Sequence, residues 1–253
     1  ALHGWLDNAN SFLAVAEPLE NPLLAIDFAG HGYSDHRPDG VATHYEDHVR
    51  DVLAVADDMQ WTSFILLGHS MGAGVACLFA ATFPERVSKL VLIEGLGPPT
   101  TSGADAADSL RKAIGDMQAL PGKQKPVYAS FEEAVGARTK SFGGLCEAAS
   151  RQLCERALEQ VPGGWTWRTD ARLRLASSLR LTEEMVEGFL RAIRSPSILI
   201  LGDQGMGGQD MFRHRLDWVD GLTVVRLAGR HHLHMEDAAG VADALKPFLD
   251  QPN

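Results

Sequence analysis

The sequence predicts an α/β fold, with a mostly parallel sheet and helices on both of its faces. Short apolar runs recur along the chain, and each is followed by glycine with a polar or ionisable residue nearby. That pattern is typical of buried parallel strands. Segments with helical periodicity separate several of the runs. The predicted strands are residues 23–26, 64–67, 90–93, 198–201 and 224–227, after a stub of strand at the start of the chain.

Helices are predicted in order between these strands. Residues 11–20 and 43–60 have helical periodicity, and the second segment gathers Val49, Val52 and Ala56 on one face. A helix is expected from about 71 to Phe83, because Pro84 cannot continue it. A final helix around 237–249 closes the chain.

The alternation of strand and helix stops after Gly97 and resumes at Pro196. Residues 98–195 are predicted to be mainly helical, with breaks at 121–122 and 162–164, where proline precedes glycine. The sequence therefore predicts a core made of residues 1–97 and 196–253, interrupted by a helical insertion at 98–195.

The most informative motif is Gly68-His69-Ser70-Met71-Gly72, which follows the apolar run 64–67 directly. This G-x-S-x-G pattern is typical of a sharp strand-to-helix turn that presents a serine as a nucleophile. Glycine is expected at the two flanking positions for a steric reason, because a side chain there would collide with the turn or with a neighbouring strand.

Taken together, these motifs resemble the α/β-hydrolase superfamily over all of the chain except the middle segment. The block from Leu2 to Asn8, with His3-Gly4-Trp5 at its centre, is most similar to the serine hydrolase-like group of esterase-type members. The resemblance implies that residues 98–195 form a cap over the active site, inserted after the family's sixth strand. It also implies that Ser70 is the nucleophile.

A serine hydroxyl needs a positioned base before it can attack. His231 is the expected base, because it follows the last strand and Glu236 reproduces the family's spacing of histidine and glutamate. His232 and His234 are the alternatives.

The family also implies an oxyanion hole made of two backbone amides. They would be those of Met71, after the nucleophile, and Trp5, after the His-Gly pair. The side chains of Trp5, His69, Trp165 and Trp167 are expected to contact the substrate.

Two carboxylates are candidates for the acid that orients the base. Most family members place it three residues beyond the glycine of the seventh strand, but counting from Gly202 that position is Gly205. Asp203 lies close to it. Some relatives place the acid at the end of the sixth strand, where this chain has Glu94. We expect Glu94, and Asp203 stays open as the alternative.

The predicted reaction is hydrolysis of a carboxylic ester through an acyl-enzyme on Ser70. Thioesterase, lactonase and carbon–carbon bond hydrolase activities would use the same residues. Relatives that act on epoxides or haloalkanes use an aspartate nucleophile instead. A non-catalytic binding module is the alternative of a different class, although such proteins typically lose the serine or the histidine.

Composition narrows the possible partners. The formal net charge of −10 argues against nucleic acid, which needs a basic surface. No apolar stretch is long enough for a membrane span. Cys77, Cys146 and Cys154 have no metal-type pairing, so we expect free thiols and a cytoplasmic protein. No metal or cofactor motif occurs, and the sequence leaves the oligomeric state open.

The insertion differs from the rest in charge. It holds 14 of the 23 Lys and Arg residues but 12 of the 33 Asp and Glu residues. Four of its arginines lie near the two tryptophans in the sequence. Either they belong to a solvated surface, or one of their guanidiniums lies at the mouth of the pocket and binds an anionic part of the substrate. They are Arg168, Arg172, Arg174 and Arg180.

The chain opens two residues before the His-Gly turn. In the family, the strand ahead of this turn lies centrally, between the strand ending near Asp27 and the one ending at Gly68, and a hairpin precedes it. We therefore expect roughly 25–35 further residues ahead of Ala1 in the natural protein. A targeting segment would lie there.

Overall fold

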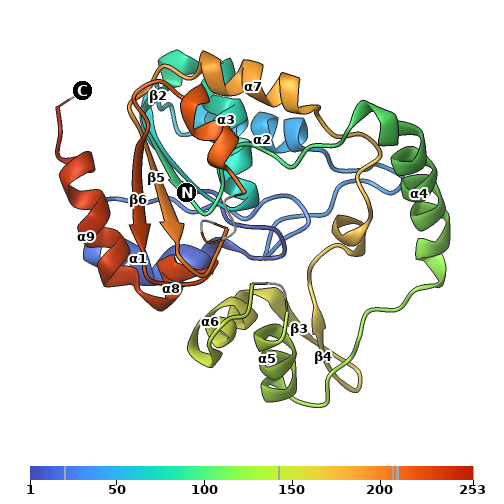
Figure 1. The fold of residues 1–253 in the computed structure, drawn as a ribbon. Helices are drawn as coiled ribbons and strands as arrows, with labels where there is room; N and C mark the ends of the chain where they lie inside the picture. The colour runs from blue at the N-terminus through green and yellow to red at the C-terminus, as the bar shows by residue number, and fades with distance from the viewer. Residues whose placement is uncertain (20, 142, 207, 209–210, 253) are drawn as a thin grey trace.

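The central sheet is parallel, as predicted (Figure 1). The computed structural model describes residues 1–19, 21–141, 143–206, 208 and 211–252. Four strands lie side by side in the order β1-β2-β5-β6. Their bounds are β1 (Phe64–His69), β2 (Val87–Ile93), β5 (Ser197–Gly202) and β6 (Thr223–Leu227).

The start of the chain lies beside β1. Leu2 forms single parallel bridges to Ile26 on one side and to Gly68 of β1 on the other. The predicted strand at 23–26 is therefore reduced to a bridge at Ile26. At the opposite end of the sheet, β6 is an edge strand whose Val224 is exposed, so the expectation of a buried strand there is wrong.

Helices cover both faces of the sheet, which confirms the predicted layering (Figure 1). One apolar cluster joins the sheet to helices on one face, and a second cluster joins it to helices on the other. The first face carries α2 (Tyr45–Asp58), α3 (Met71–Thr82) and α7 (Glu183–Ala192), and the second carries α1 (Leu13–Leu19) and α9 (Ala238–Leu249).

The insertion is not purely helical. A two-stranded antiparallel hairpin, β3 (Leu158–Val161) and β4 (Gly164–Trp167), follows its helices. Its last helix, α7, buries Val186 and Leu190 in the core cluster with α3. In Figure 1, α5, α6 and the hairpin form a group beyond the carboxyl ends of β5 and β6. The remaining helices are α4 (Ala106–Ala119), α5 (Phe131–Thr139), α6 (Glu147–Ala157) and α8 (Leu233–Glu236).

Short 3-10 helices complete the chain, and two of them matter for the site. These are η1 (Ala9–Phe12) and η5 (Ala171–Arg174). The others are η2 (Pro84–Arg86), η3 (Gly103–Asp105), η4 (Leu120–Gly122) and η6 (Arg213–Trp218). Within the described residues, no helix has both the length and the apolar character that crossing a bilayer requires.

Candidate active site

Ser70 lies on the turn between β1 and α3, in a backbone conformation that non-glycine residues rarely adopt. Its φ is 52° and its ψ is −113°. The glycines of the motif make this turn possible. A Cβ on Gly68 would lie 2.4 Å from the carbonyl oxygen of Gly72, and a Cβ on Gly72 would lie 2.0 Å from that of Leu2. Neither position tolerates a side chain, because both neighbours are backbone.

His231 lies between Ser70 and Glu94. Its Nε2 is 2.9 Å from the Ser70 hydroxyl oxygen, and its Nδ1 is 3.1 Å from Oε2 of Glu94. The carboxylate can only accept, so the proton belongs on Nδ1. Nε2 then carries the lone pair that can accept the serine proton. This is the arrangement that a general base requires.

The Glu94 carboxylate is held by the backbone of the loop after β5. Oε1 accepts a hydrogen bond from the Gly202 amide and Oε2 accepts one from the Met206 amide, each at 2.6 Å. A Cβ on Gly205 would lie 2.2 Å from Oε2. The position where the family usually has its acid is therefore glycine here, and the carboxylate of Glu94 lies next to it.

Asp203 faces a different partner. Its Oδ1 accepts a hydrogen bond from the Gly229 amide at 2.9 Å, and the residue is exposed. The structure therefore places Glu94, and not Asp203, against His231.

The two alternative bases, His232 and His234, contact other side chains. His232 contacts Asp7, with 3.2 Å between Nε2 and Oδ2. His234 contacts the Ser11 hydroxyl at 2.8 Å. Glu236 accepts a hydrogen bond from the Cys146 amide at the start of α6, so it fastens the insertion to the core.

Hydrogen bonds to both ring nitrogens of His3 hold the start of the loop from His3 to Asp7. The Phe28 amide donates to Nε2 of His3 at 3.1 Å, so Nδ1 carries the proton and donates to the Gly4 carbonyl at 2.8 Å. The Trp5 indole donates to the carbonyl of Leu173 in η5 at 2.7 Å. The loop is thus tied both to the core and to the insertion.

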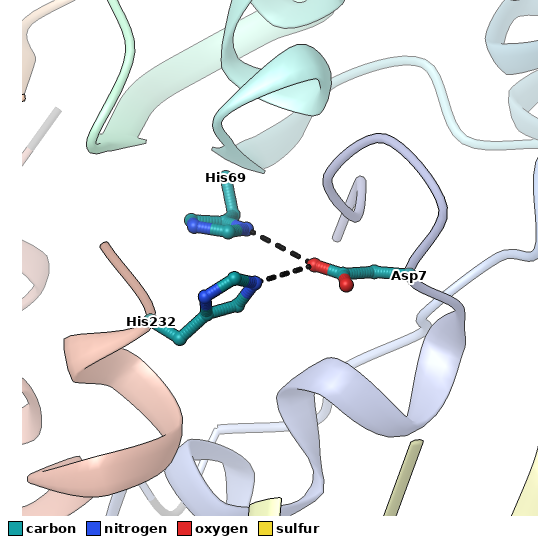
Figure 2. Close-up of side chains that lie close together, drawn as sticks. All are labelled: Asp7, His69 and His232. Atoms are coloured by element: carbon teal, nitrogen blue, oxygen red, sulfur yellow. Dashed lines mark hydrogen bonds and ion pairs between the residues drawn. The ribbon is translucent and has the colours of Figure 1, made fainter. Parts of the chain in front are cut away.

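Asp7 gathers two histidines beside this loop (Figure 2). One potential metal-ligand atom each from Asp7, His69 and His232 lies within 4.8 Å of the others. His69 lies in the serine motif, far from Asp7 and His232 in the sequence, and the fold brings the three residues together. Both carboxylate oxygens are already engaged: Oδ2 with His232, and Oδ1 with the guanidinium of Arg138, a residue of α5.

Burial and charge set the ionisation of this cluster. Burial alone would raise the pKa of Asp7, but the His232 and Arg138 side chains offset it and hold that pKa well below its usual 3.8. Burial lowers the pKa of His69 well below 6.5, and the nearby histidines lower it further. Asp7 is therefore a carboxylate at neutral pH, and His69 is uncharged.

A small cavity of about 70 Å³ opens onto Ser70 and His231. Trp5 and His69, two of the residues expected to contact the substrate, are among its lining residues. Several of its lining residues, such as Leu6, Arg138 and Ser141, were not predicted from the sequence. Arg138 and Ser141 lie far from Ser70 in the sequence, and only the fold brings them to the cavity. The full lining is Gly4, Trp5, Leu6, Asp7, His69, Ser70, Arg138, Ser141, Arg174, His231 and His232.

Trp165 and Trp167, which were also expected to contact the substrate, do not line this cavity. Trp165 packs against Phe131 with ring centroids 5.3 Å apart, and Trp167 packs against Tyr128 at 5.9 Å. These rings pack against a small apolar cluster within the insertion, formed by Ala134, Val135, Cys154 and Leu158. Apolar burial explains both tryptophans without a substrate.

Of the four arginines singled out in the insertion, the structure brings one to the cavity, namely Arg174. Arg172 binds Asp170 and the carbonyl of Pro38. Arg168 binds the Leu158 carbonyl. Arg180 is exposed and is not part of the lining.

Comparisons with known proteins agree with this architecture. A family model described as the alpha/beta hydrolase fold matches residues 1–131. A serine hydrolase-like protein of Danio rerio is 31% identical over 98% of this chain and 80% of its own length. A probable serine hydrolase of Drosophila melanogaster is 30% identical over 99% of this chain and 80% of its own length.

Among solved structures, a hypothetical protein from Pseudomonas aeruginosa PAO1 is 45% identical, with a TM-score of 0.92. The match covers 98% of this chain and 88% of that one. Sequence and fold therefore lead to the same assignment: the chain belongs to the α/β-hydrolase family, in its serine hydrolase-like group.

Proposed function

We propose that the protein hydrolyses carboxylic esters through an acyl-enzyme on Ser70. The observation that carries the proposal is the continuous line from the Ser70 hydroxyl through His231 to Glu94, with contacts of 2.9 and 3.1 Å. The buried Glu94 carboxylate and its two backbone donors favour one orientation of the imidazole. Such a line activates a hydroxyl that is otherwise a poor nucleophile.

The proposed reaction has two halves. Ser70 attacks the ester carbonyl while Nε2 of His231 takes the hydroxyl proton, and Glu94 stabilises the imidazolium that forms. His231 then returns the proton to the leaving alcohol, which leaves an acyl group on Ser70. In the second half, His231 takes a proton from water, and the resulting hydroxide attacks the acyl-enzyme. The bond between the acyl group and Ser70 then breaks, the acid is released, and His231 returns the proton to the Ser70 oxygen.

The backbone amides of Trp5 and Met71 would bind the oxyanion. Met71 is the first residue of α3, so the positive end of the helix dipole supports negative charge there. One such donor is typically worth about 10²–10³ in turnover. We propose residues 98–195 as the cap, with α7 returning to the core layer.

A reactive-serine probe tests the proposal. A fluorophosphonate should label Ser70, and Ser70→Ala should lose both the label and the turnover of p-nitrophenyl acetate. Ser63→Ala is the control, because Ser63 is exposed just before β1 and outside the cavity. Retention of more than a few per cent of the turnover in Ser70→Ala would show that another group carries the reaction.

A further inference from the structure

The cavity that opens onto Ser70 has an unusual charge pattern for this protein. Its ionic lining is Arg138, Arg174 and Asp7, whereas the chain as a whole has a formal net charge of −10. His69 adds no charge, because burial holds its pKa well below 6.5. Two guanidiniums and one carboxylate therefore face the same small space.

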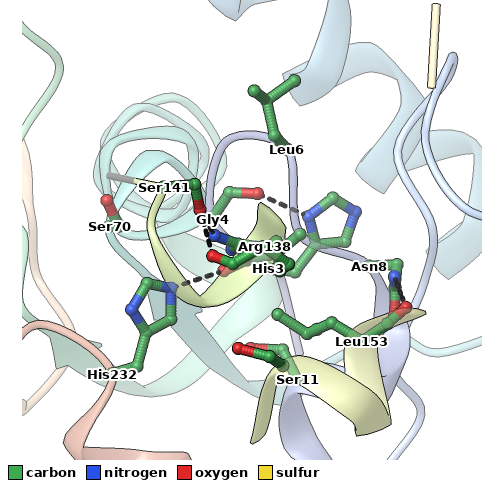
Figure 3. Close-up of polar contacts among 12 residues, drawn as sticks. His3, Gly4, Leu6, Asn8, Ser11, Ser70, Arg138, Ser141, Leu153 and His232 are labelled. Carbon is green, nitrogen blue, oxygen red and sulfur yellow. Dashed lines mark hydrogen bonds and ion pairs between the residues drawn. The ribbon is translucent and has the colours of Figure 1, made fainter. Parts of the chain in front are cut away.

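Arg138 is fixed in place by its neighbours (Figure 3). Its guanidinium donates to Oδ1 of Asp7 and to the Ser141 hydroxyl, and the Ser141 hydroxyl donates to the carbonyl of Arg138 at 2.6 Å. The residue is 9% exposed, and its Nε has no hydrogen-bond partner among the described residues. Asp7 balances the charge of Arg138, so the second guanidinium in the lining is left uncompensated.

Arg174 is that second guanidinium. It lies at the end of η5 and lines the cavity, and its exposed side chain forms no hydrogen bond or ion pair with any described residue. Arg172, two residues earlier, is bound to Asp170 at 2.9 Å and to backbone carbonyls. The same short helix thus uses one arginine to hold the structure and presents the other to the cavity.

An unpaired guanidinium at the wall of a small cavity attracts anions. Its planar fork matches a carboxylate, with two parallel hydrogen bonds. The Arg174 side chain is exposed, so this attraction should depend on ionic strength.

We propose that Arg174 is a specificity-determining residue that binds a carboxylate in the acyl part of the substrate, because the charge of Arg138 is already balanced by Asp7. This inference rests on the proposed ester hydrolysis at Ser70 and names its substrate class. The substrates are short monoesters of dicarboxylic acids.

The first test compares two esters of the same shape: mono-p-nitrophenyl glutarate, and p-nitrophenyl 5-methylhexanoate, in which an isopropyl group replaces the carboxylate. In Arg174→Gln, the ratio of kcat/KM for the charged ester to that for the neutral ester should fall about tenfold. Arg180→Gln, a cap arginine outside the cavity, should keep the ratio of the unmodified protein. An equal ratio in the two variants would overturn the subsite.

Salt gives an independent readout on the unmodified protein. Raising the ionic strength from about 0.05 M to about 0.5 M should lower the same ratio, because mobile ions screen the attraction between the carboxylate and Arg174. In Arg174→Gln the salt response should shrink. An identical salt response in both proteins would contradict the proposal.

The second test does not depend on catalysis. Isothermal titration of Ser70→Ala with glutarate should show binding, and adding Arg174→Gln should weaken it about tenfold. Binding without ester turnover in the unmodified protein would refute the hydrolase proposal and keep the subsite. Turnover without glutarate binding would do the reverse.

Discussion

Three residues with a left-handed backbone lie at the site although none is glycine. Leu6, Ser70 and Glu94 have φ values of 62°, 52° and 53°. Such conformations cost on the order of 1–3 kcal/mol each and persist only where surrounding contacts fix them. Ser70 and Glu94 are held by backbone hydrogen bonds from Ser70 to Ile93 and from Glu94 to Ile200, both 2.9 Å. The neighbouring strands thus hold two residues of the proposed triad in position.

Mutation of the two candidate acids should separate their roles. Glu94→Gln should lower kcat about 10³- to 10⁴-fold, because loss of the carboxylate removes the tautomer control of His231. Asp203→Asn should lower kcat less than about tenfold, since that side chain bonds only to the Gly229 amide in the described structure. Steady-state kinetics with p-nitrophenyl acetate measure both. A crippled Asp203→Asn with a nearly normal Glu94→Gln would assign the acid to Asp203.

Gly205→Ala should impair turnover although the residue carries no reactive group. Its new Cβ would lie 2.2 Å from Oε2 of Glu94, so the carboxylate would have to move away from His231. We expect kcat to fall about 10- to 100-fold, the scale of a misplaced catalytic contact. Gly188→Ala in α7 is the control, because no atom lies within 4 Å of its added Cβ. Normal turnover in Gly205→Ala would mean that the loop yields without disturbing Glu94.

At the scale of elements, polar contacts bind the insertion to the core at several points. Asn8, at the N-terminus of η1, donates to the Leu153 carbonyl of α6 at 2.9 Å, and Arg156 of α6 bonds to Asp27 at 2.7 Å. The Arg138–Asp7 pair adds a buried contact from α5. The proposed cap is therefore anchored on the loops that also shape the cavity.

A second set of contacts joins the C-terminal part of the insertion to the core. Glu183, at the start of α7, accepts hydrogen bonds from Arg215 of η6 at 2.6 and 2.8 Å and from Thr100 at 2.7 Å. The Arg215 hydrogen bonds, supported by those from Thr100 and His214, lower the Glu183 pKa from 4.5 to about 2. A depressed pKa of this kind stabilises the fold above the unfolded-state pKa, and the benefit is lost as pH falls toward the folded-state value.

Glu183→Gln should therefore destabilise the protein in a pH-dependent way. The difference in unfolding free energy from the unmodified protein should be full near pH 7 and should shrink between about pH 5 and pH 2. Urea denaturation at a series of pH values measures it. Glu184→Gln is the control, because Glu184 is exposed and bonds to no described residue through its side chain. A difference independent of pH would show that the carboxylate charge is not what stabilises this junction.

For the whole molecule, the proposed cap and the core are expected to limit the substrate together. The cavity at Ser70 measures about 70 Å³, which is room for only a few small groups. A series of p-nitrophenyl esters should therefore show its highest kcat/KM at short acyl chains and a decline for long ones. A maximum at long-chain esters would mean that the cap moves away from the core to admit substrate.

The sequence by itself determined the parallel α/β layering, the serine turn and the family, because all of them depend on local patterns. Apolar runs, helical periodicity and the glycines beside Ser70 impose their geometry on near neighbours in the chain. The same reasoning pointed to His231 and to Glu94, but it left Asp203 and His232 as alternatives. Each choice depended on which side chain a distant loop brings within hydrogen-bond distance.

Only the tertiary structure decided those contacts and the walls of the cavity. Arg138 meets Asp7 across 131 positions of sequence, and no local pattern predicts that contact. Trp165 and Trp167 were expected to contact the substrate, but the hairpin packs both against an apolar cluster within the insertion. Long-range packing selects among side chains that are locally equivalent, so the sequence specified the reacting groups more fully than the substrate they would accept.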